Sequence, residues 1–271
     1  MKKILSKKII IPAVLILILA IPLLSVYLLT YPCFSADIKM NGDNTDPSHL
    51  LEIRRRPAVL MYHSISNRAA QVTPENFERQ IRYLSDNDFT FLFAEKIFSS
   101  DNYEKPIIIT FDDGYRDNYE TAFEILKKYN AKATIFMITD NIGKEGFLTK
   151  EQIKRLEASG LVRVEPHTHN HTVMSQQSLE HVIMQIEKSN AVLREITGRE
   201  HRVFAYPFGE FNDDVRDIIT WYYDIAFATD TGSLLDIFAL HRQRITNRCM
   251  LFNMRAFRKH AAVTYIDIIV D

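Results

Sequence analysis

Cysteine is scarce in this sequence, and its scarcity excludes two kinds of small scaffold. The chain has 271 residues and 2 cysteines, Cys33 and Cys249. Two cysteines are too few for a disulfide framework, and their separation does not match the spacing of a structural metal site. The fold must therefore depend on a hydrophobic core, which a chain with 46% hydrophobic residues can build.

A surplus of basic residues is also missing from most of the chain. Four lysines lie within the first eight residues, and the rest of the chain has 29 basic and 34 acidic side chains, a net charge near −5. Binding to nucleic acid favours clustered lysine and arginine. We therefore expect no nucleic-acid partner. Internal repeats and low-complexity segments are absent as well.

Charged residues are absent from residues 9–29, which follow the basic tip. A stretch of about 20 apolar residues is long enough to cross a membrane as a helix, whereas the apolar part of a cleavable signal is usually about 7–15 residues long. We expect residues 1–30 to form a cytoplasmic basic tip and one transmembrane helix. The lysines before the span should stay inside, so the rest of the chain would be extracytoplasmic, in the periplasm or at the cell surface. The alternative is a long signal cleaved near Ser35–Ala36.

Two further segments follow the predicted anchor. Residues 31–56 are polar, show no sustained periodicity and are typical of a tether. From Pro57 onward, short apolar runs alternate with helical patterns. We expect strands at 58–62, 106–111, 133–138, 161–164, 201–206 and 225–228, and helices at 74–87, 118–129, 149–159, 179–196 and 212–222. This alternation predicts one α/β domain over residues 57–271, with a parallel sheet or an α/β barrel.

Polar residues directly follow several of the predicted strands. His63 follows the first strand, Asp112 and Asp113 follow the strand at 106–111, and three histidines follow the strand at 161–164. In α/β folds the active site lies beyond the carboxyl ends of the strands. We therefore expect these side chains to converge at one rim of the domain.

The residue types at this rim are those of a catalytic zinc site, which uses three protein ligands and leaves one position open. One aspartate and two of His167, His169 and His171 would supply three ligands. The second aspartate could then act as a general base beside the cation. Each feature alone has an ordinary explanation, because an aspartate pair can cap a helix and a histidine-rich segment can be a surface tract. Their coincidence at matched strand ends favours a metal site.

Three motifs in this chain resemble those of a known family. TFDDG (110–114), H-T-x-x-H (167–171) and A-Y-P-F-G (205–209) resemble the successive motifs of the polysaccharide deacetylases, the NodB-homology domain of carbohydrate esterase family four. The resemblance covers about residues 57 to 260. The opening PAVLMYHSI and the form A-Y-P-F-G are most similar to the branch that deacetylates poly-β-1,6-N-acetylglucosamine. The resemblance implies a deformed (β/α) barrel that binds a divalent metal, commonly Zn²⁺.

The resemblance also implies roles for the residues of the first two motifs. Asp112 would be the general base, and Asp113, His167 and His171 would be the metal ligands. His169 would then be an intervening residue, and Thr168 would orient the loop.

The third motif implies a substrate groove. The backbone N–H of Phe208 would donate to the oxyanion, while Tyr206 and Phe208 would line the groove. The family's final motif carries a histidine that acts as general acid, and Ala239-Leu240-His241 fits it loosely. The following Arg242-Gln243-Arg244-Ile245 resembles a branch of the family in which that histidine is not always kept. His63 is a second candidate for the acid or for a substrate contact.

The chain departs from the family at one position with a chemical role. Many members have an arginine in the third motif that holds the general base, and here Ala205 stands at that position. Arg202, three residues earlier, is the substitute that the sequence offers.

The implied reaction is metal-dependent hydrolysis of the N-acetyl group of N-acetylglucosamine in an exopolysaccharide or in peptidoglycan. Two alternatives stay open. One is a catalytically impaired, membrane-tethered carbohydrate-binding protein. The other is a deacetylase or deformylase that acts on a lipid-linked sugar, which the predicted anchor would allow.

Overall fold

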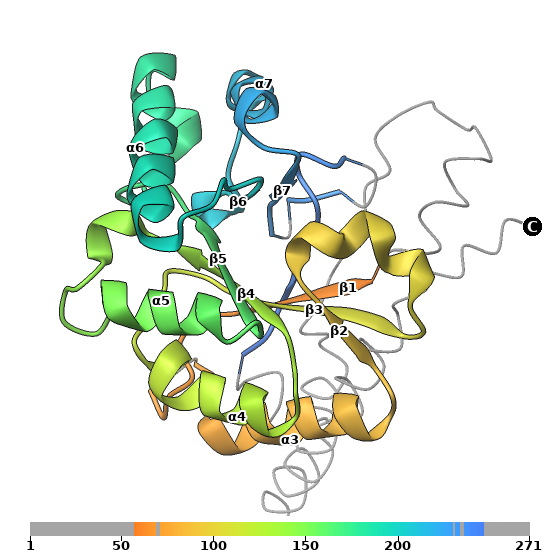
Figure 1. Cartoon of the computed structure of the whole chain (residues 1–271). Coiled ribbons are helices and arrows are strands. Elements are labelled where there is room, and N and C mark those ends of the chain that lie inside the picture. The colour runs from red at the N-terminus through yellow and green to blue at the C-terminus, as the bar shows by residue number, and fades with distance from the viewer. Residues whose placement is uncertain (1–56, 69–70, 230, 234–235, 247–271) are drawn as a thin grey trace, which may run out of the picture. The chain divides into compact units, whose positions relative to one another are not determined.

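The computed structural model describes residues 57–68, 71–229, 231–233 and 236–246 (Figure 1). The predicted anchor, the predicted tether and both cysteines lie outside these residues. Within the described part of the chain, no helix combines the length and the apolar character that a membrane span requires. The expected anchor therefore stays a prediction from sequence.

Six parallel strands form the main sheet. They are β1 (Ala58–Tyr62), β2 (Thr90–Leu92), β3 (Pro106–Phe111), β4 (Ala133–Met137), β5 (Val162–Pro166) and β8 (Gln243–Arg244). Their order is β5-β4-β3-β1-β8, and β2 pairs with β3 outside this path. The first half of β3 pairs with β2 (Leu92↔Ile108), while its second half pairs with β4 (Thr110↔Thr134). The expected α/β fold with a parallel sheet is confirmed.

A second sheet contains the short parallel strands β6 (Val203–Ala205) and β7 (Ile225–Phe227). Leu240 links the two sheets: its carbonyl accepts from the N–H of Ala228, and its own N–H donates to Ala226. A short segment then leads from Leu240 into β8, which pairs with β1. The expected deformed barrel is thus present in part. The described strands form two separate hydrogen-bonded sheets and do not close into one ring.

In the described part of the chain, five α-helices connect the strands. They are α3 (Pro74–Asp86), α4 (Phe123–Lys128), α5 (Lys150–Ala158), α6 (Leu179–Thr197) and α7 (Asp213–Tyr222). Side-chain caps set four of their starts, at Thr73, Thr149, Ser178 and Asn212. At α5, Thr149 and Gln152 form a reciprocal capping box. A π-helical turn, η2 (Asn118–Ala122), precedes α4. The predicted helices are therefore present, with ends shifted by a few residues.

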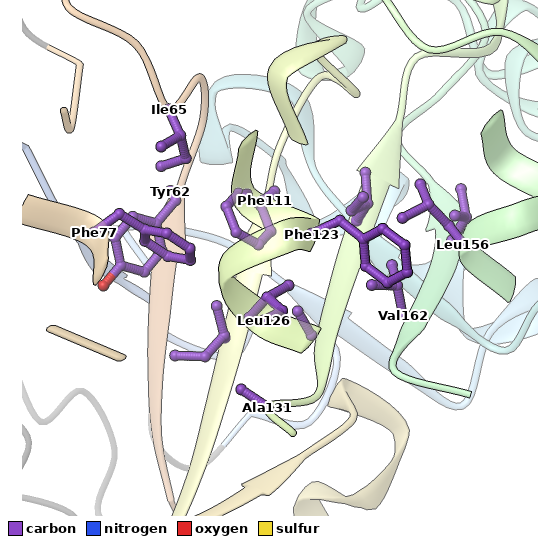
Figure 2. Close-up of a cluster of buried hydrophobic side chains, with 14 of the residues drawn as sticks. Tyr62, Ile65, Phe77, Phe111, Phe123, Leu126, Ala131, Leu156 and Val162 are labelled. Carbon is purple, nitrogen blue, oxygen red and sulfur yellow. The ribbon is translucent and has the colours of Figure 1, made fainter. Parts of the chain in front are cut away.

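The helices and sheets form successive layers. The main sheet packs against α3, α4 and α5 through a large cluster of buried hydrophobic residues, which Figure 2 shows around Phe77, Phe111 and Phe123. A second cluster lies between the two sheets and includes Ile108 and Ala205. A third cluster joins β6 and β7 to α6 and α7. The 3₁₀ segment η1 (Ala94–Asn102) contributes Ala94 and Ile97 to the cluster between the sheets.

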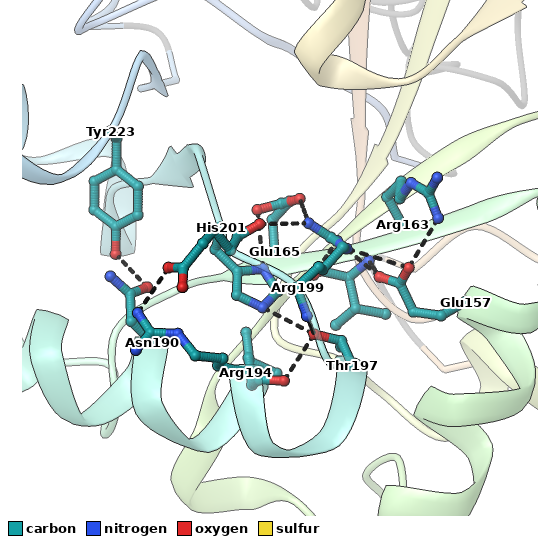
Figure 3. Close-up of polar contacts among 12 residues, drawn as sticks. Glu157, Arg163, Glu165, Asn190, Arg194, Thr197, Arg199, His201 and Tyr223 are labelled. Carbon is teal, nitrogen blue, oxygen red and sulfur yellow. Dashed lines mark hydrogen bonds and ion pairs between the residues drawn. The ribbon is translucent and has the colours of Figure 1, made fainter.

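A polar network fixes the end of α6 against β5 (Figure 3). Arg199 binds Glu157 and Glu165, each with a 2.7 Å contact between a guanidinium nitrogen and a carboxylate oxygen. His201 Nδ1 lies 3.2 Å from the second oxygen of Glu165, and His201 Nε2 lies 3.2 Å from Thr197 Oγ1. Because Glu165 is buried, these partners offset the cost of removing its charge from water.

Candidate active site

The alternation of side chains along β3 directs Asp112 toward the space between the two sheets. Ile107, Ile109 and Phe111 belong to the cluster under α3 and α4, whereas Ile108 faces the other sheet. Successive side chains of a strand point to opposite faces, so Thr110 and Asp112 share the face of Ile108. Asp112 is buried, with 3% of its surface exposed.

Arg242 holds the Asp112 carboxylate in a buried bidentate ion pair. Its Nη1 lies 2.6 Å from Oδ1 and its Nη2 lies 2.7 Å from Oδ2. The same guanidinium donates to the carbonyl of Ala228 and to Thr110 Oγ1, and it lies over the ring of Phe136. Arg242 is itself fully buried. This geometry fixes both the position and the ionisation of the carboxylate.

The charge of Arg242 decides the protonation state of Asp112. Burial alone would raise the pKa of this carboxyl, but Arg242, with smaller contributions from His167 and His63, lowers it to about 2. Asp112 is therefore ionised across the neutral range.

The expectation that Arg202 replaces the family's missing arginine is wrong. Arg202 lies on the surface, where its Nη1 is 3.8 Å from Asp224 Oδ1. Arg242 occupies the position beside Asp112 instead. The sequence offered only a weak signal for it, because the segment from Arg242 to Ile245 resembled one branch of the family without implying a role for Arg242.

Asp113 leaves the strand by a sharp change of backbone direction. Its φ is 71°, and the φ of Gly114 is 77°. A Cβ at Gly114 would lie 2.0 Å from Met137 Sδ and would displace that side chain, and the positive φ also favours glycine here. The turn places Asp113 close to the Tyr115 side chain. Burial and the neighbouring Asp112 charge raise the pKa of Asp113, and His63 opposes this rise.

Two imidazoles face the Asp113 carboxylate. His167 Nε2 lies 3.8 Å from Asp113 Oδ1, and His171 Nε2 lies 3.5 Å from the same atom. His167 Nδ1 is 2.7 Å from the carbonyl of Ala205, so Nδ1 carries the proton and Nε2 presents its lone pair. Burial lowers the pKa of His167 to about 3, and it also lowers the pKa of His171. Both imidazoles are therefore neutral near pH 7.

The donor set of Asp113, His167 and His171 fits a divalent cation. One ligand atom from each lies within 4.8 Å of the others. Asp113 Oδ1 is buried and has no hydrogen-bond partner among the described residues. His167 Nε2 cannot satisfy that oxygen, because the proton of this imidazole is on Nδ1, and His171 Nε2 lies 3.5 Å from it. A cation at this point would satisfy all three atoms, and the combination of two imidazoles and a carboxylate suits zinc and similar metals.

The structure also resolves which two histidines belong together. His169 points to a different loop, where its Nδ1 is 2.9 Å from Thr139 Oγ1 and its Nε2 is 3.6 Å from Asp140. Thr168 has a φ of 64° and accepts the N–H of His171 on its hydroxyl. The tight turn at Thr168 is therefore what lets His167 and His171 face the same point.

Phe208 lies beside the three-residue cluster and is open to solvent. Its ring centroid is 4.4 Å from that of His171, and 55% of its surface is exposed. Its φ of 60° is unusual for a residue with a Cβ.

Tyr206 does not line a groove, contrary to expectation. It has no exposed surface, it stacks on Phe211, and its hydroxyl donates to the carbonyl of Phe238. Its position follows from strand alternation, since Phe204 and Tyr206 share one face of β6 and pack under α6 and α7.

The two candidates for a general acid occupy different surroundings. His63 is half-buried after β1 and acts electrostatically on both Asp112 and Asp113. His241 is also half-buried, and its Nδ1 lies 3.0 Å from the carbonyl of Thr229. Its backbone directly precedes Arg242, which brings this segment to the rim.

Comparison with known proteins agrees with the geometry. The sequence profile of the family described as polysaccharide deacetylase matches residues 99–222. The chain is 31% identical over 222 residues to YxkH of Bacillus subtilis (strain 168), a protein named as a polysaccharide deacetylase, and the alignment covers 78% of this chain and 79% of YxkH.

Two further similarities extend this result. Poly-beta-1,6-N-acetyl-D-glucosamine N-deacetylase of Staphylococcus aureus (strain MSSA476) is 28% identical over 213 residues, which cover 66% of this chain and 73% of that protein. The solved structure of BC0361, a polysaccharide deacetylase from Bacillus cereus, superposes with a TM-score of 0.68 at 30% identity. It covers 76% of this chain and 69% of that one.

Proposed function

Because this chain belongs to the polysaccharide deacetylase family, we propose that it hydrolyses the N-acetyl group of N-acetylglucosamine residues in a polysaccharide. One observation carries the proposal. A buried, unpartnered carboxylate oxygen and two neutral imidazoles converge beside a second carboxylate that an arginine keeps ionised. The named substrate of the Staphylococcus aureus relative supports poly-β-1,6-N-acetylglucosamine as the first polymer to test.

Asp113, His167 and His171 would hold the metal, and we propose Zn²⁺. A divalent cation supplies Lewis-acid chemistry at this place, because it polarises a carbonyl oxygen and lowers the pKa of water. Neighbouring residues orient two of these ligands. The carbonyl of Ala205 fixes the tautomer of His167, and Thr168 fixes the turn that orients His171.

Asp112 would act as the general base. Its low pKa keeps it ionised, and the bidentate contact with Arg242 leaves lone pairs on both oxygens. The proton of the attacking water would pass to one of these oxygens. Arg242 would hold the carboxylate in the direction of the substrate, as a positioning residue.

The remaining steps would use the rim around the cluster. The backbone N–H of Phe208 would donate to the oxyanion that forms on the carbonyl oxygen of the acetyl group, and such stabilisation is usually the largest single contribution in acyl transfer. The exposed Phe208 ring would contact the sugar. Either His241 or His63 would donate a proton to the departing amine.

We also propose that the domain over residues 57–271 acts outside the cytoplasm, held by the predicted helix in residues 1–30. The uncharged stretch 9–29 and the lysines before it support this proposal.

The experiment is acetate release by the purified protein from three polymers: poly-β-1,6-N-acetylglucosamine, chitooligosaccharides and peptidoglycan. We expect release from at least one, loss of release with a chelator, and recovery when Zn²⁺ is added back. Asp112→Asn should bind the metal normally and release no acetate. A metal-loaded protein that binds a polymer but releases nothing would refute the proposal and favour a carbohydrate-binding role.

A further inference from the structure

The motif that follows the paired aspartates contains two polar residues that the mechanism above does not use. In the stretch Gly114-Tyr-Arg-Asp-Asn-Tyr119, Asp117 and Asn118 lie at the start of the π-helical turn η2. Such turns are rare, and they recur at functional sites. Their side chains form hydrogen bonds with the loop that follows β1.

Asp117 receives two donors from this loop. Its Oδ2 accepts from Ser64 Oγ at 2.5 Å, and its Oδ1 accepts from the backbone N–H of Ile65 at 3.0 Å. The Ser64 side chain is buried and also lies 2.7 Å from Ser66 Oγ. A charged acceptor for a backbone N–H fixes the conformation of a loop more firmly than a neutral one.

Asn118 binds the residue between β1 and Ser64. Its Nδ2 donates to the carbonyl of His63 at 2.8 Å and contacts Asp117 Oδ1 at 3.3 Å. Asn118 is 1% exposed. Asp117 and Asn118 together hold three consecutive residues of the loop, His63, Ser64 and Ile65. We call this arrangement the loop clamp.

The loop clamp fixes the backbone that carries the His63 side chain. On its other side, the loop is tied to the catalytic strand, because the N–H of Asp112 donates to the carbonyl of Tyr62 at 2.9 Å. His63 is thus held between Tyr62 and Ser64, both of which are fixed, while its imidazole remains half-exposed at the rim. It lies near enough to Asp112 and Asp113 to act electrostatically on both.

We propose that Asp117 and Asn118 are positioning residues that place the His63 imidazole against the reacting sugar, so that His63 donates the proton to the leaving amine. This inference rests on the proposed deacetylase function. In the step, the C–N bond breaks, the amine nitrogen takes the proton of the imidazolium, and the acetyl group leaves as acetate. Asp117 and Asn118 touch neither the substrate nor the metal ligands and act through His63.

A merely structural role for the loop clamp predicts different results. If Asn118 only stabilised the fold, its loss would lower the melting temperature and weaken every property of the site together. If it acts through His63, its loss lowers kcat, leaves metal binding intact and has no effect once His63 is gone. Coupled residues of this kind give non-additive double-mutant cycles.

The test uses the full chain with Asn118→Ala, His63→Ala and the double variant, on the polymer that the wild-type protein deacetylates. The matched control is Glu120→Ala, because Glu120 is exposed on the same turn. We expect Asn118→Ala to lower kcat roughly 10- to 100-fold, as small displacements of catalytic groups do. KM and the Zn²⁺ stoichiometry should change less than about twofold, and the control should match the wild type. In the His63→Ala background, Asn118→Ala should lower kcat by less than about twofold.

Two outcomes would overturn the inference: an Asn118→Ala variant with wild-type kcat, or effects of Asn118→Ala and His63→Ala that multiply. If Asn118→Ala fails to fold, Asp117→Asn replaces it, since Ser64 and Ile65 donate to different oxygens of Asp117 and the amide replaces one of them with a nitrogen that cannot accept. A readout independent of activity is the NMR signal of the His63 ring, which should shift in either clamp variant and not in the control. If the wild type releases no acetate, the proposed function is refuted. The NMR measurement still tests the loop clamp in that case, because an unshifted His63 signal in the clamp variants would refute it independently.

Discussion

Replacing Arg242 with methionine removes the cation of the buried ion pair with Asp112 and keeps most of the side-chain volume. In the folded protein, both partners are almost fully shielded from water. Removing one partner of such a pair leaves a buried charge without compensation, which costs about 3 to 5 kcal/mol. We expect the free energy of unfolding of Arg242→Met to fall by about this amount at pH 7.

The pKa of Asp112 predicts how the destabilisation by Arg242→Met changes with pH. The folded-state pKa of Asp112 is about 2, below its ordinary value of 3.8. Its ionisation therefore contributes roughly 2 kcal/mol of stability above about pH 4, and this contribution is lost as the pH falls toward 2. Without Arg242, burial acts with less opposition and raises the pKa of Asp112. The stability difference between wild type and variant should therefore be largest near neutral pH, shrink as the pH falls through the raised pKa of the variant, and shrink further below pH 4.

The assay is urea denaturation followed by circular dichroism between pH 3 and 7, with a chelator present so that metal binding does not contribute. Asp112→Asn and the double variant complete the cycle, and we expect a coupling energy of at least about 2 kcal/mol. A destabilisation below about 1 kcal/mol, or independent effects of the two substitutions, would refute the reasoning. Deacetylation should fall by at least tenfold in Arg242→Met, because the base loses its orientation.

Three other substitutions test other parts of the structure. His171→Ala should weaken Zn²⁺ binding at least 100-fold in equilibrium dialysis, and unchanged binding would show that the cation lies elsewhere. Tyr206→Phe should lower the free energy of unfolding by about 1 kcal/mol, because the hydrogen bond to Phe238 is lost. The KM for the polymer should stay within about twofold of the wild-type value. A large rise in KM would show that Tyr206 does contact the substrate. Arg199→Met should destabilise the fold by about 3 kcal/mol, because Glu165 stays buried without its cation, and normal Zn²⁺ stoichiometry would separate this loss from an effect on the metal site.

The residues closest to the chemistry were the ones that sequence could predict. Asp112, Asp113, His167 and His171 lie in short motifs at strand ends, and strand ends of a parallel sheet meet. From the spacing alone, any two of the three histidines in the segment 167–171 could be the metal ligands. His169 is separated from the other two by contacts with Thr139, which comes from a different loop and has no signature in the histidine segment.

Arg242 was missed for a different reason. It is separated from Asp112 by 130 residues, and the strand that directly follows it, β8, has two residues, too few for any periodicity to reveal. The strand β2 and the segment η1 were missed likewise, since three strand residues and a 3₁₀ segment leave no amphipathic pattern. The prediction that Tyr206 lines the groove was wrong, although the sequence held the information to avoid it. Tyr206 lies two residues after Phe204, so alternation places both side chains on the same buried face.

Four residues of the site share a backbone conformation that residues with a Cβ adopt rarely. Asp113, Thr168, His171 and Phe208 all have φ between 60° and 71°. Each such residue costs about 1 kcal/mol relative to glycine, and Thr168 carries the added strain of a branched side chain. A library of variants selected for heat resistance alone would therefore accumulate glycine or asparagine at these positions. Directed evolution of this protein should select for acetate release and melting temperature together, because the two pull in opposite directions at these four residues.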